Sequence, residues 1–238
     1  MSPARLLTTL RRELRAVGDP ERAKGAQAYM KSTMPFHGVG AVPFRRVCKE
    51  VFARIELPSA DAWQAFVLGV WRGAKFREER YAAVELTGDR RARPFQTLDA
   101  LPMYEEMIVT GAWWDCVDGI ASHRIGGLLR AYPREMRRVL LAWSRDADIW
   151  KRRAAILSQL TFKQDTDLAL LYACIEPSIG SREFFLRKGI GWALRQYAWT
   201  DPREVLRYVT ANRARLSPLT KREALKNVIR QGLASRVP

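Results

Sequence analysis

The sequence predicts an all-α protein built from stacked pairs of helices. Apolar residues recur every three or four positions along nearly the whole chain, and no run alternates strictly in twos, which is the period of helices rather than of strands. Capping residues followed by a first-turn proline mark helix starts at Asp19-Pro20, Asp201-Pro202 and Ser217-Pro218. Related segments also return at steps of about 35 to 37 residues.

In chain order, this pattern predicts short helices joined by short connections. The caps at Asp19, Asp201 and Ser217 begin three of them, and breaks in the apolar period separate the others. The expected helices cover residues 3–16, 20–33, 43–56, 60–72, 75–90, 99–110, 113–131, 133–145, 148–161, 165–176, 182–198, 201–213 and 218–233.

The recurring segments indicate a repeat architecture. They begin near Arg77 (REERYAAVEL), Trp114 (WDCVDGIA), Trp150 (WKRRAAILSQL), Phe185 (FLRKGIGWALRQY) and Thr220 (TKREALKNVI). Each offers an early aromatic or capping residue, then basic residues, then small and aliphatic ones, as one helix of a HEAT-like pair does. An irregular bundle with accidental spacing is the alternative. Because five units recur at nearly the same spacing, we favour a HEAT-like solenoid, which is an α-α superhelix with a concave groove. We expect it to form a single domain over residues 1–238, with the repeats clearest from 75 to 233.

The charge balance predicts a polyanionic partner. Lys and Arg total 41 against 25 for Asp and Glu, so the formal net charge is +16. A field of this sign attracts phosphates, and their neutralisation releases counterions, which favours nucleic acid over anionic lipid or mere solubility. Basic pairs recur at equivalent positions of successive repeats, and we expect them to line the groove. The alternative is that they lie on solvated helix faces, where basic residues are common. The pairs are Arg152 and Arg153, Arg187 and Lys188, and Lys221 and Arg222.

Several functional classes are not supported by the sequence. No stretch approaches the about 18 apolar residues that span a bilayer, and the N-terminus has no apolar signal region, so we expect a cytoplasmic protein. Cys48, Cys116 and Cys174 form no CxxC pair, and His37 and His123 are expected to be structural, so no metal site is indicated. No P-loop or dinucleotide fingerprint is present, and we expect no cofactor.

The segment from Gly111 to Asp118 (GAWWDCVD) is the most unusual in the chain. Asp115 lies in a first helical turn, where a carboxylate caps the helix. Asp118 follows Trp114 by four residues, which places both side chains on one face. From the pattern alone, Trp114 can be core or functional, and Asp118 can be a salt-bridge partner or a catalyst.

A third candidate is Trp192, in a cation-rich helix that also contains Gly189 and Gly191. Each glycine costs about 1 kcal/mol relative to alanine inside a helix. We therefore expect a neighbouring helix or a ligand to approach closely there. Trp192 itself can be core or functional.

From Tyr29 to the end, the chain contains the segments YMKSTMPFHGV, EEMIVTGAWWDCVDGIA, DIWKRRAAILSQL, SREFFLRKGIGWALRQYAWTDP and LSPLTKREALKN. The patterns WWDxVD, IWxxRAAI and KxIGWxLRxY occur in them in this order. In these segments and patterns the chain resembles the AlkD family of DNA alkylation repair glycosylases. Two positions depart from the family pattern: Gly189, where alanine is more common, and Arg152, where a neutral residue is common.

The resemblance implies roles for individual residues. The two tryptophans and the aspartate that family members use at the lesion correspond to Trp114, Trp192 and Asp118. Residues that grip the DNA backbone correspond to Tyr29, Arg153 and Arg195.

The resemblance further implies hydrolysis of the N-glycosidic bond of positively charged N3- and N7-alkylpurines in double-stranded DNA, without a deep pocket for a flipped base. A monomer is the simplest expectation. A non-catalytic nucleic-acid-binding scaffold and a protein-interaction scaffold are the alternatives, and base release from alkylated DNA discriminates between them and the enzyme.

Overall fold

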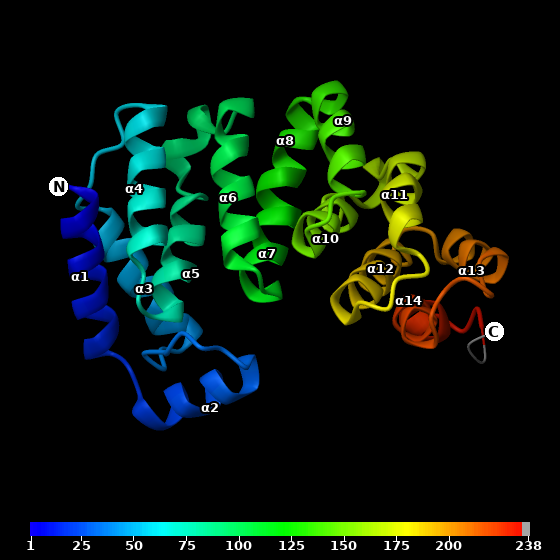
Figure 1. Ribbon diagram of the computed structural model, residues 1–238, viewed down its shortest axis with the longest axis horizontal. Coiled ribbons are helices and arrows are strands. Elements are labelled where there is room, and N and C mark those ends of the chain that lie inside the picture. The colour runs from blue at the N-terminus through cyan, green and yellow to red at the C-terminus, as the bar shows by residue number, and fades with distance from the viewer. Residues whose placement is uncertain (235–238) are drawn as a thin grey trace. The chain divides into compact units, whose positions relative to one another are not determined.

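The computed structural model describes residues 1–234, and its regular structure is helical throughout this range, with no strand (Figure 1). The all-α, helical-repeat prediction is therefore confirmed. The chain divides into two compact units, Met1–Met103 and Tyr104–Pro238. The boundary falls inside α6 (Leu101–Gly111).

Unit 1 is a bundle in which α1 packs against three later helices, α3, α4 and α5. Leu6, Leu10 and Leu14 of α1 are fully buried there, together with Trp63 of α4. The indole nitrogen of Trp63 donates to the carbonyl of Leu86 at 3.1 Å, so even this large side chain leaves no polar atom unsatisfied. The helical elements of the unit are α1 (Pro3–Ala16), α2 (Pro20–Met30), α3 (Ala41–Phe52), α4 (Ala60–Gly73), α5 (Arg77–Leu86), and the 3₁₀ turns η1 (Arg90–Phe95) and η2 (Leu98–Ala100).

Two adjacent carboxylates at the start of α5 hold the loop between α2 and α3. Glu78 accepts hydrogen bonds from the backbone amides of His37, Gly38 and Val39 at 2.8 to 3.1 Å. Glu79 accepts two from Arg11 of α1 at 2.7 and 2.9 Å, and Oε1 of Glu79 lies 3.4 Å from Nε2 of the loop residue His37. His37 is buried in this network, as the structural role expected of it requires.

Unit 2 carries four of the five recurring segments. They coincide with α7, α10, α12 and α14, which begin at Trp114, Ile149, Phe184 and Pro218, whereas the fifth segment is α5 of unit 1. Within unit 2, α10 packs on α7 and α12, and α12 packs on α14, so equivalent helices of successive repeats are neighbours. Between these helices in the chain lie α9 (Pro133–Trp143), α11 (Leu168–Ile175) and α13 (Pro202–Ala211). The remaining bounds are α7 (Trp114–Gly119), η3 (Ile120–Ile125), α8 (Gly126–Ala131), α10 (Ile149–Leu157), η4 (Lys163–Asp165), η5 (Glu176–Ser178), α12 (Phe184–Tyr197) and α14 (Pro218–Arg230).

The predicted helix starts are confirmed at all three cap-proline pairs. The Asp19 carboxylate accepts from the amides of Glu21 and Arg22, Asp201 from that of Glu204, and Ser217 from that of Thr220. Each following proline occupies the first helical turn, where its missing amide costs nothing.

The helix expected over 113–131 contains a π-helical segment, η3, between α7 and α8. The apolar period did not reveal it, because a single wide turn shifts that period only locally. Such segments occur often at functional sites. This one begins two residues after Asp118, whose carbonyl accepts a hydrogen bond from the Ser122 hydroxyl at 2.7 Å.

Candidate functional site

A bidentate ion pair links Asp118 of α7 to Arg153 of α10. The Nε atom of Arg153 lies 2.7 Å from Oδ1 of Asp118, and Nη2 lies 2.8 Å from Oδ2. Nη1 of the same guanidinium donates to the carbonyl of Phe185 in the first turn of α12. Arg153 therefore connects three successive repeat helices at one point.

The pair lies largely inside the protein. Only 6% of the Arg153 side chain and 12% of the Asp118 side chain are exposed. Burial raises the pKa of the Asp118 carboxyl above its ordinary value, and the Arg153 guanidinium opposes that rise. Each carboxylate oxygen receives one nitrogen from Arg153 and still has a lone pair for a further donor, such as a water molecule.

Trp113 and Trp114 have different surroundings. Trp113 packs edge-on against Phe185, with ring centroids 4.9 Å apart, and lies 6.1 Å from Trp150. Trp150 is 4.9 Å from Phe185, so these three rings form one cluster. Trp114, the first residue of α7, is partly exposed. The sequence had not singled out the ring cluster, and its only signal was the spacing of aromatic residues at the starts of successive repeats.

Trp192 lies on α12 and is partly exposed. A Cβ atom added to Gly189 would lie 3.2 Å from Nη1 of Arg153. One added to Gly191 would lie 2.5 Å from Cβ of Glu223 on α14. The close approach expected from the two glycines is confirmed, and α10 makes it at Gly189 and α14 at Gly191.

The basic residues expected to form a track have diverging partners. Arg152 donates to the carbonyl of Pro177 and to the hydroxyl of Ser178, whereas Arg153 turns to Asp118. Because adjacent helical residues point about 100° apart, these two do not share one side of a groove.

The other expected DNA contacts are placed as follows. On α12, Lys188 and Arg195 both donate to Glu223, and Arg187 is half-buried. On α14, Lys221 is half-buried and Arg222 is exposed. Tyr29, in unit 1, is 77% exposed. For all of these residues, DNA binding stays a prediction.

Glu223 is a polar residue that sequence reasoning missed. It is a single acidic residue in the otherwise basic segment TKREALKN, and its carboxylate is buried. It is 35 positions after Lys188, about one repeat, which was the available signal.

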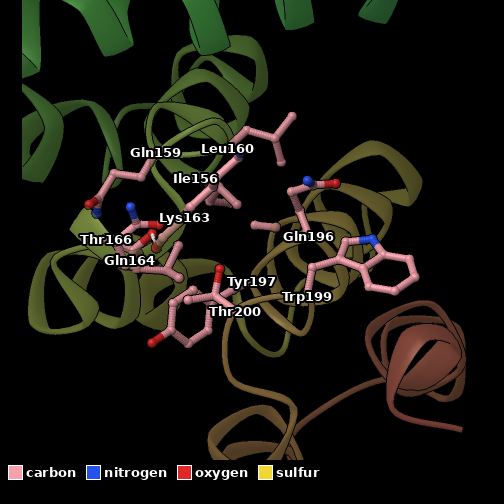
Figure 2. Close-up of a pocket in the computed structure, with 12 residues that line it drawn as sticks. Ile156, Gln159, Leu160, Lys163, Gln164, Thr166, Gln196, Tyr197, Trp199 and Thr200 are labelled. Atoms are coloured by element: carbon pink, nitrogen blue, oxygen red, sulfur yellow. Dashed lines mark hydrogen bonds between the residues drawn. The ribbon is translucent and has the colours of Figure 1, made fainter. Parts of the chain in front are cut away.

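A surface cavity of about 420 Å³ lies elsewhere in unit 2. Figure 2 shows side chains from α10, the following loop and the C-terminal end of α12 around it, among them Gln159, Lys163, Tyr197 and Trp199. Asp118, Trp114 and Trp192 are not among its lining residues. Catalysis by those three residues would not depend on this cavity.

Two further observations concern the described residues. All three cysteines are buried free thiols, and residues 1–234 contain no group of three or more His, Cys, Asp or Glu side chains arranged to hold a metal ion. Among the helices of the same range, none has both the length and the apolar character needed to cross a membrane.

Comparison with known proteins identifies relatives over most of the chain. A family model described as DNA alkylation repair enzyme matches residues 10–228. Among solved structures, the chain is similar to a predicted DNA alkylation repair enzyme from Enterococcus faecalis, with 27% sequence identity and a TM-score of 0.79 over 88% of this chain and 95% of that one. No curated protein matches the sequence.

Proposed function

The chain belongs to the family of DNA alkylation repair enzymes, and we propose that it is a monofunctional DNA N-glycosylase of the AlkD type. It releases purines that carry positive charge through alkylation at N3 or N7 from double-stranded DNA. The observation that carries the proposal is the Asp118 carboxylate, held by Arg153 beside the helix that bears Trp192.

The chemistry of the substrate sets what the protein must supply. When the bond between C1′ and the base nitrogen breaks, its electron pair goes to the cationic base, which leaves neutral. The base therefore needs little help from an acid. The sugar becomes oxocarbenium-like, and a nearby ionised carboxylate stabilises that charge, as in glycoside hydrolysis.

Asp118 takes the carboxylate role in this proposal. Its free lone pairs can also orient a water molecule, which adds its oxygen to C1′ and loses a proton to the carboxylate or to solvent, leaving an abasic site. Arg153 acts through Asp118, because its two hydrogen bonds hold the carboxylate in one orientation and oppose its protonation.

The partly exposed indoles of Trp114 and Trp192 hold the lesion. Their faces attract the cationic nucleotide by cation–π interaction worth about 0.5–2 kcal/mol, and neutral lesions gain no such attraction. The basic residues of α12 and α14 bind the flanking phosphates along the HEAT-like repeats, so the lesion is recognised through the backbone rather than in a deep base pocket. In this proposal the protein acts as a monomer in the cytoplasm and needs no cofactor.

Base release from DNA that contains N3- and N7-methylpurines tests the activity. Wild type should release free methylated base, and Asp118→Asn should release it about 100-fold more slowly, because the amide carries no charge to stabilise the sugar. Arg222→Met, which removes an exposed cation from α14, should weaken DNA binding and leave the rate on saturating DNA unchanged.

Two outcomes contradict different parts of the proposal. If wild type binds duplex DNA but releases no base, the protein is the non-catalytic scaffold. If Asp118→Asn retains the full rate, the glycosylase activity stands and the role of Asp118 does not.

A further inference from the structure

One buried carboxylate on α14 gathers three cations. Oε1 of Glu223 accepts from Nζ of Lys188 at 2.9 Å and from Nζ of Lys226 at 2.7 Å, and Oε2 accepts from Nη1 of Arg195 at 2.6 Å. The Glu223 side chain is 8% exposed, whereas those of Lys188, Arg195 and Lys226 are 37%, 28% and 54% exposed. The acid is therefore inside and the cations face outward.

The charges of this group do not cancel. Three cations and one carboxylate leave a net charge of about +2 at one point on the surface of unit 2. The carboxylate stays ionised, because burial is opposed by hydrogen bonds from Lys226 and Lys188, which lower the pKa of Glu223. A group with this charge and with outward-facing donors is complementary to a phosphodiester.

Two of the cations flank Trp192. Lys188 precedes it by four residues and Arg195 follows it by three, so the three side chains share one face of α12. Gly191, next to Trp192, brings the backbone of α12 against Glu223, which is why the carboxylate can reach both cations. The Asn227 side chain also donates to the Arg195 carbonyl at 2.8 Å, which fixes α12 on α14.

We infer that Glu223 is a positioning residue, which holds Lys188 and Arg195 on either side of Trp192 as a site for one backbone phosphate next to the lesion. The inference rests on the proposed function for its role in catalysis, but the phosphate site itself does not. Long basic side chains lose much rotamer freedom when they bind. Glu223 orders these side chains before DNA binds, so less conformational entropy is lost on binding. Its negative charge also lowers the net positive charge that attracts the DNA phosphates by one unit.

Removing the charge of Glu223 should therefore have opposite effects on the affinity for DNA and on the rate of base release. Glu223→Gln raises the local charge by one, so undamaged duplex should bind more tightly at low salt, with the slope of log K against log salt steeper by about 0.9. Base release measured in a single turnover should become about tenfold slower, because the cations no longer hold the phosphate beside Trp192. If Glu223 had only a structural role, Glu223→Gln would weaken the binding of undamaged duplex and also slow base release.

Glu204→Gln is the matched control. Glu204 lies on α13, is 17% exposed and accepts hydrogen bonds from Tyr172 and Arg207 and none from Lys188 or Arg195, so its replacement adds the same unit of charge without releasing those two cations. It should leave single-turnover base release near the wild-type rate. Glu223→Asp keeps the charge but withdraws the carboxylate by one methylene, so it should slow base release without tightening binding.

The outcomes separate this inference from the proposed function. Weaker binding of Glu223→Gln to undamaged duplex, or identical behaviour of Glu223→Gln and Glu204→Gln, overturns the inference, and thermal melting of each variant checks that it is folded. If Glu223→Gln does not fold, Glu223→Asp takes its place in the test. Base release by Glu223→Asp at the same rate as wild type would then overturn the inference. If wild type releases no base, the proposed function fails, and the binding of undamaged duplex still tests the phosphate site: Lys188→Met should make the salt slope shallower by about 0.9, and an unchanged slope overturns the site.

Discussion

Replacing Arg153 with methionine should destabilise unit 2 and disturb Asp118 together. Methionine keeps much of the side-chain volume but removes both hydrogen bonds to Asp118 and the one to Phe185. Removal of one partner from a buried ion pair costs about 3–5 kcal/mol, because the other charge stays buried and unpaired. Since 12% of the Asp118 side chain is exposed, we expect the lower end, about 3 kcal/mol.

A double-mutant cycle isolates the pair. Urea unfolding of Arg153→Met, Asp118→Asn and the double variant should give a coupling free energy of about 1–3 kcal/mol. Arg130→Met is the control, because Arg130 pairs with Asp165 at the surface, where both side chains are about half exposed and the pair contributes only about 0–1 kcal/mol.

The same variant carries a pH prediction. Burial already raises the pKa of Asp118, and without Arg153 it should rise further. The proposed mechanism needs the ionised carboxylate, so base release is lost as the pH falls through this pKa. The acidic limb of the rate profile should therefore move to higher pH in Arg153→Met. A coupling free energy below about 0.5 kcal/mol, or an acidic limb that does not move, would refute the reasoning.

Two further predictions concern folding. Glu79 is fully buried, and although burial alone would raise its pKa, hydrogen bonds from His37, Arg11 and the Lys75 amide lower it from 4.5 to about 2. The ionised group therefore contributes up to about 3 kcal/mol to stability above pH 4.5, and this contribution is lost as the pH falls toward 2. Urea unfolding across this pH range should show the loss in wild type and not in Glu79→Gln. A parallel decline of stability in both proteins would contradict the assignment to Glu79. Gly191→Ala should lower stability by about 1–3 kcal/mol, because the new Cβ atom would lie 2.5 Å from Cβ of Glu223. Gly189→Ala should cost less, because its nearest neighbour, Nη1 of Arg153, would lie 3.2 Å from the new Cβ atom, which is a tight contact rather than an overlap. Thermal denaturation compares the two variants, and equal costs would show that α14 yields easily.

Local chemistry made much of the fold predictable. The cap at Asp19 works through amides two and three residues away, and those at Asp201 and Ser217 through the amide three residues away, so a short window of sequence contains the whole interaction. Gly189 and Gly191 were readable for a similar reason, because glycine inside a helix is unfavourable unless something needs the space. The π-helical turn after Asp118 was missed, since its extra residue leaves the average period almost unchanged.

The candidate site was only partly predictable. The resemblance supplied Trp114, Asp118 and Trp192, and the pattern left Asp118 open between ion pairing and catalysis. In the structure Asp118 forms an ion pair with Arg153. In the proposed function it also stabilises the positive charge that develops on the sugar. The repeat pattern placed Arg152 and Arg153 together in one basic track, yet Arg152 bonds to η5 and Arg153 to α7.

The sequence by itself therefore determined the helical class, the repeat step, the helix starts and the basic charge, because each depends on residues close together in the chain or on composition. Only the tertiary structure decided that Arg153 holds Asp118 and that Glu223 holds Lys188 and Arg195. In each case the partners are 28 to 35 residues apart. The physical reason is that a long basic side chain on a repeat helix can reach several acceptors, and the packing of the neighbouring repeat helix selects one of them.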